Sequence, residues 1–223
     1  MGMSGPGSIM RNLSISVLAL AAVLAAAPSH ADDLSRLKTR AAKVQIIRDD
    51  WGIAHIHGKT DADAAFGLGY AQSEDDFATL QDVVLATRGV LARDKGKSAA
   101  PTDYVTALLD VWPTTNAHYA ELPADLRKIL EAYADGVSVY AAKHPGKVKA
   151  GLLPLTGHDI EAGFVFKQPF FYGLDGELKR LTTPHAPPPP AKGSNGLATA
   201  PSRNADGATR LLVNSHQPYT GPV

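Results

Sequence analysis

The fold is decided near the end of the chain, where residues 193–217 run GSNGLATAPSRNADGATRLLVNSHQ. Two strands are expected in this stretch: Asn195–Ser202, which contains Leu197 and Thr199, and the apolar Leu211–Val213. Between them stands Asp206-Gly207, a strong signal for the two-residue type I′ turn of a β-hairpin. Because an isolated hairpin is marginally stable in water, we expect these strands to belong to a larger sheet.

Upstream of residue 182 the pattern is mostly helical, with one further hairpin. Val44–Ile47 and Ile53–His57 are β-branched runs that predict two short strands. Thr60 and Asp63 have the spacing of a capping box, so we expect a helix to follow them. Apolar residues recur every three or four positions over residues 122–140, which predicts an amphipathic helix. The sequence therefore predicts an α+β chain.

The charge balance and the lack of cysteine exclude several classes of protein. Lysine plus arginine and aspartate plus glutamate both number 22, so the formal net charge is zero. A balanced charge gives no broad field for nucleic acid, and we expect no nucleic-acid partner. The chain has no cysteine, which excludes disulfides, thiolate metal ligands and a cysteine nucleophile.

The first 31 residues have the pattern of an export signal peptide. Arg11 precedes a mostly apolar run at Leu13–Ala27, and a small-x-small cleavage site ends at Ala31. Cleavage there would make Asp32 the first residue of a periplasmic or secreted protein. The apolar run is too short and too rich in alanine for a stable membrane span, although an uncleaved anchor is the alternative. Residues 1–9 are consistent with an upstream start or a tag.

A proline-rich segment at residues 182–193 leads into Ser194. Pro187–Pro190 favour an extended polyproline conformation, as in an exposed spacer. If the Ser194 hydroxyl attacks the carbonyl of Gly193, an ester forms, and hydrolysis leaves Ser194 as a new N-terminus. Its α-amino group, which titrates near about 7.7–8.0, can then act as the base for its own hydroxyl. The same pattern is also typical of a plain linker.

Four motifs follow one another along the chain: Asp50–Ile56 (DWGIAHI), Gly67–Phe77 (GLGYAQSEDDF), the looser Ala132–Val137 (AYADGV), and Ser194-Asn195 with Leu212–Pro218 (LVNSHQP). They resemble the motifs of the penicillin acylase family of N-terminal-nucleophile hydrolases, which includes the acyl-homoserine-lactone acylases. The resemblance covers roughly residues 44–223, and the motifs occur in the family's order. The resemblance implies an αββα sandwich in the full enzyme. This chain would supply a mostly helical α-chain and the first β-hairpin of the β-chain.

The resemblance also assigns two catalytic residues. Ser194 would be the nucleophile and, through its amine, the base. His216 falls where many lactone-acylase-like members have a histidine that hydrogen-bonds near the nucleophile. A tight turn at Asp206-Gly207 would place His216 opposite Leu197, about three residues or roughly 10 Å from Ser194 along the sheet. The oxyanion donors that the resemblance implies include an Asn side chain further into the β-chain, outside these 223 residues.

We therefore divide the chain into a signal peptide (1–31), an α-chain (32–181), a spacer (182–193) and a truncated start of the β-chain (194–223). The resemblance implies autocatalytic cleavage between Gly193 and Ser194, followed by hydrolysis of a linear amide. Candidate substrates are an N-acyl-homoserine lactone, a lipopeptide or the acyl side chain of a β-lactam. No metal or organic cofactor is required, and the expected partners are the acyl amide and the remainder of the β-chain.

A second hypothesis stands beside this one. The chain could be a non-catalytic secreted fragment or a binding module that lacks the rest of the β-chain. We expect the truncated chain alone to be inactive, because the oxyanion hole would be incomplete. The reading frame of the coding DNA past Val223 would distinguish the two hypotheses.

Four other groups of residues have both a functional and a structural interpretation. His55 and His57 alternate on one strand face and could bind a metal, but a structural or surface role is favoured. The acidic run at residues 74–76 could hold calcium, but such a run more often caps or solvates a helix. Pro187–Pro190 could be an SH3-type ligand, but a spacer is favoured. An aromatic group is interpreted mainly as core, with an acyl-chain pocket as the alternative: Trp51, Phe164, Phe166, Phe170, Phe171 and Tyr172.

Overall fold

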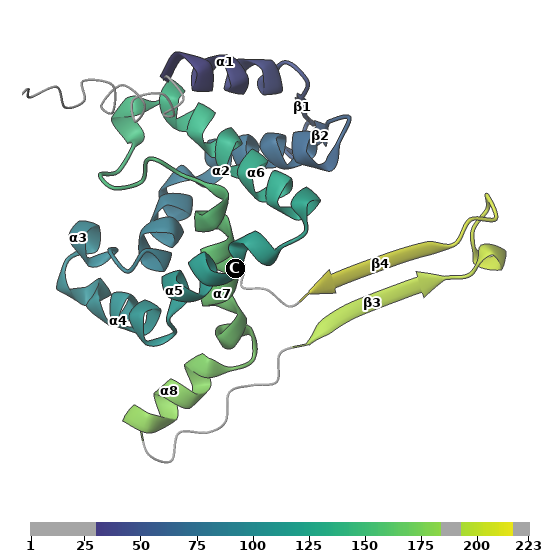
Figure 1. Cartoon of the computed structure of the whole chain (residues 1–223). Coiled ribbons are helices and arrows are strands. Elements are labelled where there is room, and N and C mark those ends of the chain that lie inside the picture. Colours follow the sequence, from purple (N-terminus) through teal and green to yellow (C-terminus); the bar gives the residue numbers. More distant parts are fainter. Residues whose placement is uncertain (1–29, 184–192, 216–223) are drawn as a thin grey trace, which may run out of the picture. The chain divides into compact units, whose positions relative to one another are not determined.

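The computed structural model describes residues 30–183 and 193–215 (Figure 1). The expected signal peptide, most of the expected spacer and the end of the chain lie outside these ranges, so those predictions stay open. The chain divides into two compact units, residues 1–38 and 39–223. The first unit is described only through the beginning of helix α1.

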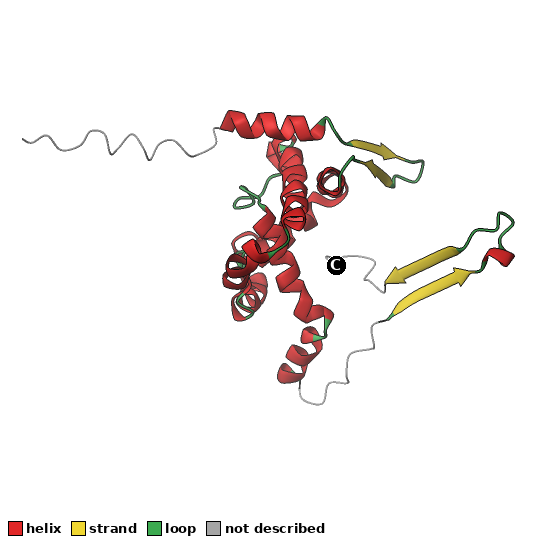
Figure 2. Ribbon diagram, turned by 45° about the vertical axis from the view of Figure 1, so that its right-hand side comes forward, coloured by secondary structure: helices red, strands yellow, loops and turns green. Residues whose placement is uncertain are grey.

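The described residues form α-helices, short 3₁₀ turns and two separate β-hairpins (Figure 2). The helices are α1 (His30–Ala41), α2 (Asp61–Thr87), α3 (Ala92–Lys95), α4 (Ala100–Leu108), α5 (Val111–His118), α6 (Ala124–Lys143), α7 (Gly157–Phe171) and α8 (Leu174–Thr182). The strands are β1 (Gln45–Arg48), β2 (Ala54–His57), β3 (Ser194–Thr199) and β4 (Arg210–Ser215). The 3₁₀ turns are η1 (Lys97–Ala99), η2 (Tyr119–Glu121), η3 (Pro145–Lys147) and η4 (Pro201–Arg203). This mixture agrees with the predicted α+β class.

The elements predicted from local signals are present, with small shifts at their ends. Thr60 is the N-cap of α2, and its side chain accepts a hydrogen bond from the backbone N–H of Asp63. The predicted amphipathic helix is α6, and Pro123 stands at its N-cap rather than inside its first turn. The predicted first hairpin is β1–β2, in which Gln45 pairs with His57. Local capping and periodicity therefore located these three elements.

Helices α2 and α6 lie side by side (Figure 1). Glycines permit this close approach. A Cβ added at Gly69 would overlap the carbonyl oxygen of Tyr133, and one added at Gly136 would overlap the carbonyl oxygen of Phe66. The two helices are therefore closely packed at Gly69 and Gly136.

The hydrophobic core is built on this helix pair and on the segment that follows α6. Val84 and Val137 from the two helices are buried, and Leu152 from the later segment is fully enclosed. The ring of Phe77 packs edge-on against that of Tyr140, with their centroids 5.0 Å apart. The core therefore joins α2, α6 and the segment that follows α6.

The break in α2 falls at Asp76 instead of at a glycine. Asp76 has non-helical backbone angles (φ −151°, ψ 73°), and its carboxylate accepts a hydrogen bond of 3.0 Å from the N–H of Thr79. That hydrogen bond lowers the pKa of the Asp76 carboxyl. Asp76 thus caps the second half of α2, which agrees with the structural interpretation of the acidic run.

Arg88, at the end of α2, fixes the segment that leads into α7. Its guanidinium donates to the buried Asp159 at 2.6 Å and to the carbonyls of Leu152 at 2.9 Å and Pro154 at 2.7 Å. Asp159 in turn accepts a hydrogen bond of 2.9 Å from the N–H of Thr156, the N-cap of α7. One arginine therefore connects three parts of the chain.

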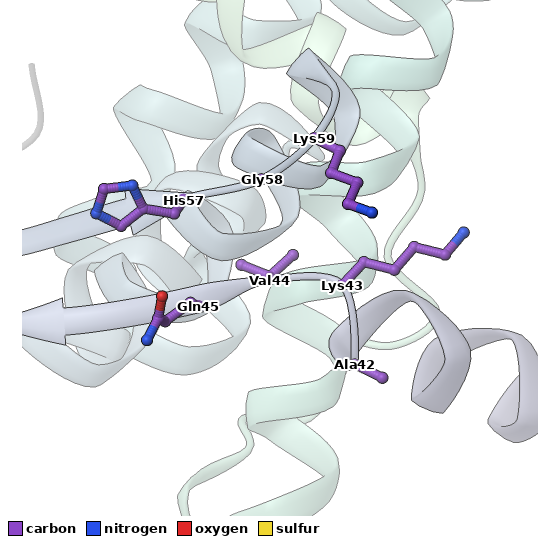
Figure 3. A pocket seen from close by; sticks show the side chains of 7 residues that line it. All are labelled: Ala42, Lys43, Val44, Gln45, His57, Gly58 and Lys59. Atoms are coloured by element: carbon purple, nitrogen blue, oxygen red, sulfur yellow. The ribbon is translucent and has the colours of Figure 1, made fainter.

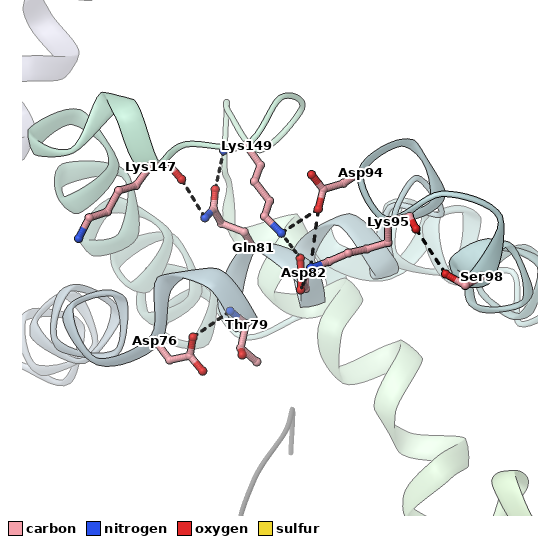
Figure 4. Close-up of polar contacts among 9 residues, drawn as sticks. All are labelled: Asp76, Thr79, Gln81, Asp82, Asp94, Lys95, Ser98, Lys147 and Lys149. Carbon is pink, nitrogen blue, oxygen red and sulfur yellow. Dashed lines mark hydrogen bonds and ion pairs between the residues drawn. The ribbon is translucent and has the colours of Figure 1, made fainter.

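A second polar cluster ties the same segment to α2 and α3 (Figure 4). The ammonium of Lys149 bonds the carboxylates of Asp82 and, at 2.8 Å, Asp94, and Lys95 reaches Asp82 at 2.9 Å. Burial raises the pKa of Asp82, but the hydrogen bonds from Lys149 and Lys95 outweigh it and leave that pKa lowered. The neighbouring Gln81 bonds backbone groups of the same segment.

Within the described residues, no helix is both long enough and apolar enough to cross a membrane.

Candidate active site

Ser194 is the first residue of β3 and is exposed, as is Gly193 before it. A scissile bond between these two residues is therefore accessible from solvent. Across the hairpin, Ser194 pairs with Ser215, the last residue of β4. The predicted nucleophile thus lies at the end of the β3–β4 ladder and directly follows the proline-rich segment in sequence.

The predicted register of this hairpin is wrong. A turn forms at Ala205-Asp206 instead of Asp206-Gly207, and it lies inside a longer connection that spans residues 200–209. The N–H of Gly207 bonds the carbonyl of Asn204 at 3.0 Å, so the tight turn is centred one residue earlier than expected. As a result Leu197 pairs with Leu212 and not with His216.

The corrected register changes the expected distance at the site. His216 itself lies outside the described residues. Its neighbour in sequence, Ser215, stands directly opposite Ser194. The separation of roughly 10 Å expected between His216 and Ser194 followed from the tight-turn register, so it no longer holds.

The aromatic group does not form a core, which corrects the favoured interpretation. Trp51 is 88% exposed and Tyr172 is 83% exposed. Phe164 and Phe171 are also exposed, and the remaining two members of the group on α7 are half-buried. Their burial depends on neighbours that the sequence pattern does not reveal. The acyl-pocket alternative therefore stays open for the four phenylalanines and the tyrosine at the end of α7.

His55 and the acidic run take part in contacts of the framework. His55 Nε2 lies 3.0 Å from Asp49 Oδ2, and this contact lowers the pKa of the Asp49 carboxyl. Arg48 reaches Glu74 at 3.1 Å and Asp75 at 2.8 Å. Across residues 30–183 and 193–215, no three His, Cys, Asp or Glu side chains gather in a way that could hold a metal ion.

A shallow hollow lies beside the first hairpin (Figure 3). It is lined by Ala42, Lys43, Val44, Gln45, His57, Gly58 and Lys59. The side chains of Lys43 and Lys59 extend on one side of it, and those of Gln45 and His57 lie on the other. None of the predicted catalytic residues lines this hollow, so we assign it no part in catalysis.

Comparison with known proteins identifies the family. The family model for penicillin amidase matches residues 43–223. This chain belongs to the penicillin amidase family.

Curated relatives in the family are acylases. The chain is 30% identical over 133 residues to penicillin acylase 2 proenzyme from Pseudomonas sp. (strain SE83), covering 59% of the chain and 17% of that protein. It is 29% identical over 116 residues to acyl-homoserine lactone acylase QuiP from Pseudomonas putida, covering 52% of the chain and 14% of that protein. It is 23% identical over 215 residues to acyl-homoserine lactone acylase PvdQ from Pseudomonas fluorescens, covering 79% of the chain and 27% of that protein. The chain thus spans between 14% and 27% of the length of these relatives.

A solved structure supports the fold. The thermostable penicillin G acylase from Alcaligenes faecalis superposes with a TM-score of 0.51 at 21% identity, covering 62% of this chain and 79% of that one. The predicted family and the predicted fold class are therefore confirmed.

The penicillin amidase motifs in the first part of the chain act as a structural framework. Arg48 NH1 donates to the carbonyl of Gly52 at 2.8 Å and NH2 to that of Ala71 at 3.3 Å, which joins the first motif to the second. The close packing at Gly69 and Gly136 joins the second motif to the third. Arg48 was not predicted as part of this framework, although its position just before the first motif is a sequence signal for such a role.

Proposed function

We propose that this protein is an N-terminal-nucleophile amidohydrolase precursor whose catalytic residue is Ser194. The observation that carries the proposal is the position of Ser194 at the exposed start of a β-strand, in a chain of the penicillin amidase family. Ser194 Oγ would attack the carbonyl carbon of Gly193, and the peptide bond would become an ester. The C–N bond between Gly193 and Ser194 would break in that step and free the α-amine of Ser194. Water would then cleave the ester, releasing the Gly193 carboxylate and regenerating the Ser194 hydroxyl.

The same serine would then hydrolyse an acyl amide. Its α-amine takes the hydroxyl proton, Oγ attacks the amide carbonyl, and the amine product leaves with that proton. Water releases the acid from the acyl-enzyme in the second half-reaction. The developing oxyanion needs donors, and the resemblance implies an Asn side chain later in the β-chain for this role. The chain spans a small part of its relatives, so this activity belongs to the full-length product of the coding sequence.

Two features favour a substrate with a long acyl chain. First, the curated relatives include acyl-homoserine lactone acylases. Second, Phe171 and Tyr172 expose aromatic rings at the end of α7, and these rings would provide an apolar surface for an acyl chain. We propose linear N-acyl amides such as acyl-homoserine lactones or lipopeptides as substrates, ahead of β-lactam side chains. Export to the periplasm or the medium is part of the proposal, because the first 31 residues have a signal-peptide pattern.

A substrate panel tests this function. The full-length product should hydrolyse N-acyl-homoserine lactones and release free homoserine lactone and fatty acid. Mass spectrometry of an acid-quenched reaction should find the acyl group on the peptide that begins at Ser194. Turnover without any acylated Ser194 would contradict the assigned nucleophile. A processed protein that is inert towards every linear amide would favour a binding module instead.

A further inference from the structure

The connection between β3 and β4 is held by one asparagine. Asn204 Nδ2 donates to Thr199 Oγ1 at 3.0 Å, at the end of β3, and also to the carbonyl of Ala208, just before β4. Its backbone N–H bonds the carbonyl of Pro201 at 3.2 Å, and its own carbonyl accepts from Gly207 at 3.0 Å. A single residue therefore contacts both ends of the connection.

An ion pair supports the second half of the same connection. Asp206 accepts two hydrogen bonds from the guanidinium of Arg210, at 3.0 Å and 2.6 Å. The hydrogen bonds from Arg210 lower the pKa of the Asp206 carboxyl. Asp206 also accepts from the N–H of Ala208 at 3.2 Å. Arg210 begins β4, so this pair sets where the second strand starts.

The sequence offers a competing register for this hairpin. A two-residue turn at Asp206-Gly207 would extend both strands towards the turn. Ala198 would then pair with Ser215, whereas in the structure it pairs with Leu211. The slip is by an even number of residues, so each side chain would keep its face. Hydrophobic burial cannot discriminate between the two registers, and the connection itself has to do so.

The choice of register decides what stands opposite the nucleophile. In the observed register Ser194 faces Ser215. In the tight-turn register Ser215 would be displaced by four residues, about 13 Å along the strand.

We propose that Asn204 is a positioning residue for the nucleophile, since it excludes the tight-turn register and so keeps Ser215, the last residue of β4, opposite Ser194. The inference rests on the proposed function of Ser194. Asn204 acts through the strands and does not touch the reacting atoms. Its amide N–H groups carry the effect, because they donate to both ends of the connection.

Register can be measured separately from catalysis. The chain has no cysteine, so an engineered pair is a clean reporter. In a Ser194→Ala background, Ala198→Cys is combined with Leu211→Cys to report the observed register, or with Ser215→Cys to report the tight-turn register. Mild oxidation of the full-length protein should cross-link the first pair and leave the second reduced. Adding Asn204→Ala should lower the yield of the first cross-link and raise that of the second.

Processing is the second measurement. With Ser194 intact and no cysteines added, Asn204→Ala should slow cleavage at Gly193–Ser194 by about tenfold to hundredfold. Asn204→Asp, which keeps the shape but loses the donor, should behave like the alanine variant. Ser202→Ala changes an exposed residue of the same connection and should process at the wild-type rate. In the processed fraction, Asn204→Ala should lower kcat and leave KM nearly unchanged.

The outcomes separate this inference from the proposed function. An unchanged cross-link pattern in Asn204→Ala would overturn the positioning role, and so would a lost register with normal processing. If the wild-type protein and its Ser194→Ala variant give the same unprocessed product, the proposed nucleophile fails. The cross-link arm would then still decide whether Asn204 sets the register.

Discussion

Ser194 and Ser215 stand opposite each other as the terminal pair of the β3–β4 ladder. The pairing joins the two parts of the last family motif, Ser194-Asn195 and Leu212–Pro218. It also brings the residue before His216 to the level of the nucleophile. The predictions below concern this pairing and the framework that precedes it.

Replacing His216 tests whether the segment after Ser215 contributes to the site. We expect His216→Ala to slow processing or turnover by about tenfold or more, the size of one lost hydrogen bond to a charged group. Rates of cleavage and of substrate hydrolysis measure the effect. His118→Ala, which removes an exposed histidine paired with Glu121, is the matched control. Wild-type rates in His216→Ala would remove this residue from the site.

A methyl group at Gly136 should force α2 and α6 apart, because its Cβ would overlap the carbonyl oxygen of Phe66. We expect Gly136→Ala to lower the free energy of unfolding by about 2–4 kcal/mol. Urea unfolding followed by circular dichroism gives the value. Gly163→Ala, in α7, has nothing within 4 Å of the added Cβ and should be neutral or stabilising. Equal effects of the two substitutions would contradict the close-packing account.

Removing Arg88 should leave Asp159 as an uncompensated buried charge. We expect Arg88→Met to lower the free energy of unfolding by about 3–5 kcal/mol. The exposed pair of Arg180 and Glu177 provides a control, and Arg180→Met should change stability by about 0.5 kcal/mol or less. A small effect at Arg88 in the same unfolding assay would show that its contacts are dispensable.

The Lys149 cluster predicts a pH dependence of stability. The pKa of Asp82 is lowered in the folded state, so its contribution is present above about pH 4 and is lost as pH falls through the lowered value. The pKa of Lys149 is raised, because its hydrogen bonds to Asp82 and Asp94 outweigh the opposing effect of burial. The contribution of Lys149 is therefore fully present below its unfolded pKa and is lost as the pH rises through its folded pKa.

Lys149→Met should lower the free energy of unfolding by about 1–2 kcal/mol near neutral pH. The difference from wild type should shrink as the pH falls below about 4. Urea unfolding between acid and neutral pH measures this trend, with the exposed Lys97→Met as the control. A difference that is constant across this range would contradict the assigned role of the cluster.

Short-range sequence signals predicted the elements that depend on contacts between residues close in the chain. The Thr60 cap and the apolar repeat of α6 act within a few residues, so the elements that they mark were located from sequence. The register of β3 and β4 was missed because a strong local turn signal competes with the contacts of Asn204, which bind both ends of the connection. The exposure of Phe171 depends on packing between distant segments, so composition alone suggested a core that the structure does not contain.

The catalytic residue was predicted from a different kind of signal than the helices and strands. Ser194 was assigned from the order of motifs along the chain, and family membership now supports that order. No geometric pattern in the sequence alone distinguished this serine from one in a linker.

The most direct measurement of the central claim is the intact mass of the purified full-length product, with N-terminal sequencing of its fragments. We predict two chains, the second beginning with Ser194-Asn195, and a single uncut chain in Ser194→Ala. An active wild-type protein that stays uncut at Gly193–Ser194, or a Ser194→Ala variant that is still cut there, would contradict the account.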